Sequence, residues 1–491
     1  MPIEPDNSPR EQPVPPPPAG PSPFARGPTG LSGAVTAFLS ITLLALLFGL
    51  SFLSPSLDRA ASFERAPETV ARVFERRLEL AAALDTLPAW ERSVIAPFLP
   101  VDVGVDEEAA SAFRRVIEVG SRLAGPDDAR EQDVAADSVR DARAVEFDAL
   151  RARRALLLAQ RGRVEEAQGD LDELTQNGHA DFVIAARALA SGRARAEDFT
   201  LAGDGWIGRT AAARARGEPP PTPGAEILRT LAWARGLAGV AGLGLLVLLG
   251  WLARNRPDVY AASVPIPSVW SPQTGFAVLV RAAFACVAIS LAIEAAAAEW
   301  ETDLPLMFRA ALASLPLFLL VRKHLARPHR MEFIDLVGFP AVRANLLLST
   351  LALFALVEVG GRALVLTSVA MGASEPWTYQ VDEFDIWSSD MTFAAAAFGS
   401  LAFGVVGVEL AFRGILFPSL RHVHGPRHAA LLSGMLFAAV QFASLPAMLA
   451  LAWGGFIAAL SVERTRCVLP AILCMVLHQF FEIALLSSLY R

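Results

Sequence analysis

VELAFRG, residues 408–414, places a glutamate and an arginine inside the apolar run LAFGVVGVELAFRGILF. A charged side chain at membrane depth costs roughly 2.5–3.5 kcal/mol on insertion scales, and such side chains usually face the interior of a helix bundle. Glu409 and Arg413 are four residues apart, so they lie on one helix face and can neutralise each other. The stretch therefore predicts a membrane helix packed among other helices.

The composition of the whole chain is that of a polytopic membrane protein. Hydrophobic residues make up 53% of the 491 residues and charged residues 19%, and the mean hydropathy of +0.41 is high for a soluble protein. The net charge of -7 is not typical of a nucleic-acid-binding protein, so no nucleic-acid partner is predicted. Cys286, Cys467 and Cys474 lie in apolar segments without metal-ligand spacing, so neither a metal site nor a cofactor is predicted.

Composition also divides the chain into segments of different character. We expect a disordered, proline-rich cytoplasmic tail over 1–30, a transmembrane helix over 31–53, an extracytoplasmic helical domain over 54–226, transmembrane helices over 227–339 and a final membrane domain over 340–491. The apolar run at 31–53 is longer than that of a typical cleaved signal peptide and no clear small-residue cleavage site follows. A signal anchor is therefore the favoured interpretation, with a cleaved signal peptide as the alternative.

Within 54–226, apolar residues recur at three- and four-residue spacing, which predicts helices. The segment ALLLAQRGRVEEAQGDLDEL resembles a tetratricopeptide-type hairpin, in which two helices are joined by a glycine turn. One such hairpin cannot bury its apolar face alone. Tandem repeats are therefore one interpretation of a segment that we otherwise describe as a helical domain.

Apolar runs predict about nine membrane spans, so the expected fold is an all-α polytopic bundle with an inserted extracytoplasmic domain. The expected spans are 31–53, 229–252, 275–297, 304–321, 344–370, 391–418, 428–446, 449–462 and 467–489. Basic loops follow alternate spans at 254–256, 322–330, 421–428 and 463–466. The intervening loops at 299–303 and 371–390 contain no Lys or Arg. The positive-inside rule then predicts an inner-membrane protein with its N-terminus and basic loops in the cytoplasm and with 54–226 outside.

Pairs of residues at i,i+4 spacing stand out in the final predicted helices: Glu409 and Arg413, Phe437 and Gln441, and His478 and Glu482. Because polar side chains in spans face the bundle interior, these faces are expected to converge. A further ion pair, Glu358 and Arg362, lies on an earlier span. It either lines a cavity or serves packing, and the sequence assigns no chemistry to it.

The segments VELAFRG, LFAAVQF and LHQFFEI occur in this order over the last helices. Together they resemble the motifs of the CPBP family of intramembrane glutamic endopeptidases, which includes CAAX proteases and bacteriocin-processing enzymes. The family pattern is Glu-Glu-x-x-x-Arg-Gly, then Phe-x-x-x-His, then His-x-x-x-Asn or Asp. The resemblance covers roughly residues 340–490 and implies a site that receives membrane peptides or proteins. The matching positions are Glu409, Arg413, Gly414, Phe437 and His478.

The departures from the family pattern affect its chemistry. Val408 stands in place of the first Glu, Gln441 in place of the second-motif His, and Glu482 in place of the final Asn or Asp. In the family, the first Glu and the second-motif His activate the attacking water, whereas the third-motif His and Asn support the oxyanion. Valine cannot accept a proton, and a neutral amide is no base at pH 7. An ionised Glu482 cannot donate to an oxyanion, although a protonated one can.

The leading hypothesis is a membrane-embedded binding or regulatory module of this family with a degenerate active site. Its site residues are Glu409, Arg413, His478 and Glu482, and the Glu409–Arg413 pair is expected to hold helices together. One alternative is an active endopeptidase in which His478 and Glu482 supply a reassigned base. Another is a sensor that acts through 54–226. The family interpretation requires Glu409, Gln441, His478 and Glu482 to share one cavity, expected to face the cytoplasm.

Overall fold

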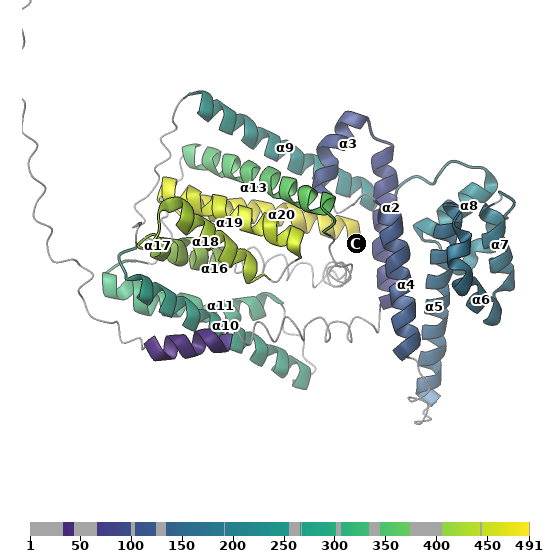
Figure 1. Ribbon diagram of the computed structural model, residues 1–491, viewed down its shortest axis with the longest axis horizontal. Helices are drawn as coiled ribbons and strands as arrows, with labels where there is room; N and C mark the ends of the chain where they lie inside the picture. The colour runs from purple at the N-terminus through teal and green to yellow at the C-terminus, as the bar shows by residue number, and fades with distance from the viewer. Residues whose placement is uncertain are drawn as a thin grey trace, which may run out of the picture.

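The computed structural model describes residues 33–43, 66–99, 104–123, 134–190, 192–254, 266, 268–300, 306–332, 344–373, 405–441 and 444–490. Every regular element within these residues is a helix, and none is a strand (Figure 1). The all-α fold class is therefore confirmed. The tail predicted over 1–30 and the first part of the span predicted over 391–418 lie outside the described residues.

The helices that precede the bundle are α2 (Ala66–Asp85), α3 (Ala89–Ile95), η2 (Ala96–Phe98), α4 (Val105–Leu123), α5 (Val134–Gln160), η4 (Val164–Ala167), α6 (Gln168–Gln176), α7 (Ala180–Ala190), η5 (Ala196–Ala202) and α8 (Trp206–Arg216). Most of them pack around an apolar core of their own, whereas α3 and η2 contribute their buried residues to a cluster shared with the bundle. In α4, Ala109, Ala112, Phe113 and Val116 are buried at the spacing of an amphipathic helix. Phe113 meets Phe74 of α2 edge to face, with 5.9 Å between ring centroids.

The hairpin expected from ALLLAQRGRVEEAQGDLDEL has the predicted local form. Helix α5 ends at Gln160, Gly162 turns the chain with a φ of 74°, and α6 begins after the short η4. Glycine suits this turn because it has no Cβ to clash in the left-handed region. The interpretation of this segment as part of a tandem repeat stays a prediction.

The membrane bundle is built mainly from helices that follow in the sequence. They are α9 (Ala225–Ala253), α10 (Pro272–Trp300), α11 (Leu306–Val321), α13 (Ala344–Ala370), α16 (Val405–Glu409), η9 (Leu410–Leu416), α17 (Phe417–Leu420), α18 (Pro426–Ala439), α19 (Leu445–Thr465) and α20 (Leu469–Tyr490). Among the described residues, five helices are long and apolar enough to span a bilayer, namely α9, α10, α13, α19 and α20. A multi-pass membrane protein is therefore supported, whereas the predicted count of about nine spans is not confirmed.

Helix length explains much of this difference. Helix α11 has 16 residues and α18 has 14, which at 1.5 Å per residue gives about 24 Å and 21 Å, less than the roughly 30 Å of a bilayer core. Helix α18 also packs extensively against α19. Hydropathy alone cannot distinguish a helix that is apolar because it crosses lipid from one that is apolar because other helices cover it.

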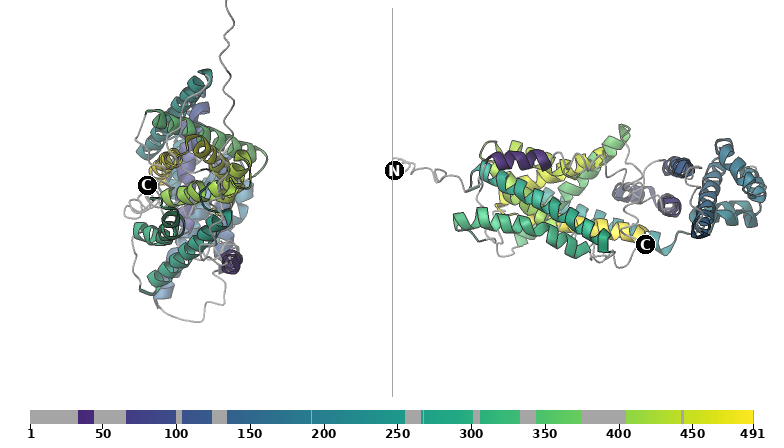
Figure 2. Two further views of the ribbon diagram at one scale, coloured as in Figure 1. Left: turned by 90° about the vertical axis from the view of Figure 1, so that its left-hand side faces the viewer. Right: turned by 90° about the horizontal axis from the view of Figure 1, so that it is seen from below.

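Helices α2 and α3 and the turn η2 lie against one end of the bundle (Figures 1 and 2). Leu80 of α2 shares a buried apolar cluster with Ile227 of α9 and Leu489 of α20. The backbone N–H of Gly224, just before α9, donates to the Glu79 carboxylate of α2 at 2.8 Å. The start of α9 and the end of α20 are thus fixed next to the preceding helices.

The basic segments meet at the opposite end of the bundle. Arg421 binds both carboxylate oxygens of Glu463, at 2.9 Å and 3.0 Å. His422 Nε2 lies 2.8 Å from the backbone oxygen of Ser268, near the start of α10. These contacts join the segment between α17 and α18, the end of α19 and the start of α10. The bundle therefore has one basic end and one end covered by α2, α3 and η2.

Candidate active site

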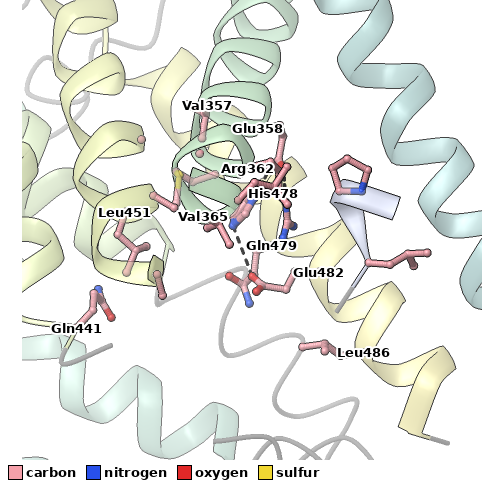
Figure 3. Close-up of a pocket in the computed structure, with 18 of the residues that line it drawn as sticks. Val357, Glu358, Arg362, Val365, Gln441, Leu451, His478, Gln479, Glu482 and Leu486 are labelled. Atoms are coloured by element: carbon pink, nitrogen blue, oxygen red, sulfur yellow. Dashed lines mark hydrogen bonds and ion pairs between the residues drawn. The ribbon is translucent and has the colours of Figure 1, made fainter. Parts of the chain in front are cut away.

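A cavity of about 560 Å³ lies among α13, α16, α18, α19 and α20. Its lining includes Val408, Glu409, Gln441, His478 and Glu482 (Figure 3). We call it the motif cavity, because these residues come from all three segments that resemble the family motifs. The sequence-predicted site positions are thus brought together in one cavity, apart from Arg413, which lies behind the wall as the partner of Glu409.

The motif cavity lies at the end of the bundle that α2 and η2 cover. Its wall includes Val369 near the end of α13 and Leu486 near the end of α20. Arg77 of α2 and Ala96 and Pro97 of η2 complete the wall. The cavity is therefore on the side opposite the basic segments, whereas the sequence led us to expect a cavity facing the same side as those segments.

Glu409 and Arg413 form a fully buried ion pair. Their side chains are 1% and 0% exposed, and Glu409 Oε1 lies 3.2 Å from Arg413 Nη1. Helix α16 ends at Glu409 and continues as the π-helical turn η9, which carries Arg413; π-helical turns are frequent at functional sites. The Arg413 guanidinium lies over the ring of Phe437 at 4.5 Å and near that of Phe412 at 5.9 Å, and such cation–π contacts are favourable in a desolvated site.

Two glycines let α18 and α19 approach closely beside Arg413. A Cβ on Gly455 would lie 3.0 Å from Arg413 Nη2 and 2.8 Å from the Cα of Gly434. A Cβ on Gly434 would lie 2.6 Å from backbone atoms of α19. Small residues at such crossings let membrane helices approach closely. The fixed crossing holds Phe437 against the guanidinium.

His478 has a partner that the motif comparison did not include. Its Nδ1 hydrogen-bonds to Oε1 of Glu358 on α13. Its Nε2 lies 3.5 Å from Glu482 Oε2, which exceeds the usual N–H···O distance of about 2.7–3.2 Å. The second oxygen of Glu358 lies 3.8 Å from Arg362 Nε. Four charged or polar side chains therefore lie in a row along the cavity wall: Arg362, Glu358, His478 and Glu482. The shorter contact of His478 is the one to Glu358.

The sequence contained only part of the signal for this arrangement. The i,i+4 spacing of Glu358 and Arg362 indicated an ion pair inside a span. It did not indicate which neighbouring helix that pair faces. The contact between Glu358 and His478 joins residues 120 positions apart, and nothing in the spacing of either helix predicts that α13 lies against α20.

Val408 and Gln441 occupy cavity positions where the family pattern has proton-accepting side chains. Val408 on α16 contributes only methyl groups to the wall. Gln441 follows the end of α18, and Figure 3 shows it on the far side of the cavity from Glu358 and His478. Neither side chain accepts a proton from water at pH 7.

Among the residues that the structure describes, no group of three or more His, Cys, Asp or Glu side chains is arranged to hold a metal ion. Cys467 and Cys474 are buried in apolar surroundings at 0% and 1% exposure, where a thiol packs as a small hydrophobic side chain.

The apolar helices define a multi-pass membrane protein, and the motif cavity lies among several of them. Comparison with protein families makes this class more specific, because residues 390–481 match the family model for type II CAAX prenyl endopeptidase Rce1-like proteins. The match includes α16 to α19 and most of α20, and it confirms the resemblance seen in VELAFRG and the later motifs. It does not include α13. Comparisons with curated proteins and with solved structures found no match.

Proposed function

We propose that the motif cavity holds a membrane peptide or protein segment, and that the water-activating route of the related endopeptidases is lost. The observation that carries this proposal is the presence of Val408 and Gln441 in the same cavity as Glu409 and His478. A valine and a neutral amide cannot remove a proton from water at pH 7. The site therefore keeps the family-matching Glu409 and His478 in one cavity but is degenerate in the family's own chemistry.

The size and lining of the motif cavity suit a peptide segment. Its volume of about 560 Å³ is within the roughly 300–1,000 Å³ typical of ligand sites. Apolar side chains such as Leu366 and Leu451 line it together with a few polar groups. This combination favours an apolar segment whose backbone groups are oriented by polar contacts.

The proposed occupant enters from the extracytoplasmic side. The cavity lies at the end of the bundle near α2 and η2, and the positive-inside rule assigns the basic end to the cytoplasm. Because Arg77, Ala96 and Pro97 contribute to the cavity wall, movement of the α2–α8 helices would change access to it. This supports a regulatory role, and it supports the alternative of a sensor that acts through 54–226.

Photo-crosslinking in liposomes tests the binding site. Benzoylphenylalanine in place of Leu451, in the cavity wall, is expected to capture an added fluorescent single-span peptide. The same replacement of Leu246 on α9, which is 67% exposed on the bundle surface, is the matched control. Equal capture at the two positions would contradict a specific binding cavity.

A second experiment tests whether the residues at positions 408 and 441 account for the loss of water activation. Val408→Glu together with Gln441→His restores the family pattern at both positions. We expect this double variant to cleave captured peptide faster than wild type and faster than either single variant, because the carboxylate and the imidazole act together on water. A double variant that gains nothing would mean that positions 408 and 441 do not account for the missing chemistry.

A second candidate function is an endopeptidase with a reassigned base, and one contact favours it. His478, expected to act with Glu482, lies 3.5 Å from that residue and also hydrogen-bonds to Glu358, and all three residues line the motif cavity. The cavity thus contains a carboxylate in contact with an imidazole, although position 408 contributes none.

A further inference from the structure

Glu358 is a buried carboxylate that the family motifs do not explain. It belongs to α13, outside the matched residues 390–481, and it is 3% exposed. Its Oε1 contacts His478 Nδ1 and its Oε2 faces Arg362. Glu358, Arg362 and His478 all line the motif cavity. A buried carboxylate held against one imidazole nitrogen, with the other nitrogen toward a cavity, is the arrangement that orients a general base.

The contact determines which nitrogen of His478 can act as a base. When Glu358 accepts a hydrogen bond from Nδ1–H, the neutral imidazole has its lone pair on Nε2. The distance of 3.5 Å from Nε2 to Glu482 Oε2 is longer than a normal hydrogen bond. Nε2 lies beside the Glu482 carboxylate, and both residues line the motif cavity, where the proposed reaction places a water next to Nε2.

We propose that Glu358 and His478 replace the water-activating pair lost at positions 408 and 441, with His478 as the catalytic base and Glu358 as its positioning residue. The inference rests on the proposed occupation of the motif cavity by a peptide. It differs from a base made of His478 and Glu482, because the residue that selects the His478 tautomer comes from α13 and not from the same helix.

The reaction is peptide hydrolysis with water as the second reactant. His478 Nε2 takes a proton from water while the water oxygen forms a bond to a peptide carbonyl carbon. The tetrahedral species then breaks its C–N bond, and the proton passes from Nε2 to the departing nitrogen. The products are a carboxylic acid and an amine, and His478 returns to its neutral form with Glu358 unchanged throughout.

The test uses full-length protein in liposomes and quenched fluorescent single-span peptides, selected first by capture at Leu451. Wild type is expected to cleave the captured peptides, and His478→Gln is expected to abolish cleavage. Glu358→Gln should lower kcat roughly 10²–10⁴-fold with KM almost unchanged, because an amide no longer selects the tautomer. Glu358→Asp keeps a carboxylate and should recover part of the rate. Glu463→Gln, which changes a glutamate in an ion pair at the basic end, is the matched control.

Each contrary result has a distinct meaning. Captured peptides that wild type leaves intact would overturn the catalytic inference and leave the binding proposal standing. Cleavage by Glu358→Gln at the wild-type rate would remove the positioning role. If both Glu358 variants lost peptide capture as well as cleavage, Glu358 would be a structural residue only. Failure of wild type to capture any of the peptides would instead refute the proposed function itself.

Discussion

Removing one member of the buried Glu409–Arg413 pair is expected to destabilise the bundle far more than removing both. The side chains are 1% and 0% exposed, with 3.2 Å between their nearest charged atoms. Among the residues that the structure describes, their charged atoms have no hydrogen-bond partner. Each charge is therefore compensated mainly by the other, with a further contribution to Arg413 from the ring of Phe437.

The expected loss of folding stability depends on which charge each variant leaves buried. Glu409→Leu leaves an isolated buried cation and Arg413→Met an isolated buried anion, and breaking a buried pair in this way costs roughly 3–5 kcal/mol. A loss of 3 kcal/mol lowers the folding equilibrium constant by roughly 150-fold. The double variant replaces both charges with apolar side chains of similar volume, which is often close to neutral for buried pairs. The double variant should therefore be more stable than either single variant.

Equilibrium unfolding in mixed micelles measures the four proteins of this cycle, with tryptophan fluorescence as the signal. Glu463→Gln provides the comparison for a less buried pair, because Arg421 and Glu463 are 17% and 20% exposed, and it should cost about 1 kcal/mol. A double variant that loses the sum of the two single losses would refute the reasoning. So would single variants that lose no more than Glu463→Gln.

Further variants test other contacts. Gly434→Ala should cost roughly 1–3 kcal/mol in the same unfolding assay, because its Cβ would lie 2.6 Å from backbone atoms of α19; an unchanged stability would contradict the close crossing. Glu79→Ala should speed hydrogen exchange at the Gly224 amide, which loses its 2.8 Å acceptor, and unchanged exchange would argue against this link between α2 and α9. Burial raises the pKa of Glu75 above 4.5, against the opposing effect of Arg153. The folded state then holds this proton more tightly, so the contribution of Glu75 to stability is full below pH 4.5 and is lost as the pH rises through the raised pKa. Glu75→Gln should gain stability relative to wild type over that rise, and a difference in melting temperature that stays constant with pH would contradict this.

The sequence was sufficient for the helical class and for the residues of the three motifs. Periodicity places Glu409 and Arg413 on one helix face, and exclusion of charge from lipid turns that face inward. The same argument applies to Gln441 and His478, and both line the motif cavity. The number of spans was harder to predict, because α18 is apolar through contact with α19 and has only 14 residues.

The contact between Glu358 and His478 could not be predicted in the same way. A helical period gives the direction of a side chain relative to its own axis and contains no information about the neighbouring helix. The neighbour of α20 is set by packing among α9, α13 and α19. A family pattern does not supply it either, because the matched segment begins at residue 390, after α13 ends.

Because Glu358 lies on α13, outside the segment that matches the family, the substitution at position 408 does not by itself remove every carboxylate from the cavity. Val408 removes a carboxylate from α16, but water in the motif cavity responds to every side chain that lines it, whichever helix provides that side chain. Glu358 keeps a carboxylate at the wall and pairs it with His478 in place of a residue at position 441. A water activated there would lie beside α13 and α20, on the far side of the cavity from Gln441 (Figure 3). Arg77 of α2 and Pro97 of η2 also line the motif cavity, so a peptide bound there would contact both elements. Relocation of the base would thus place α2 and η2 beside the bound peptide.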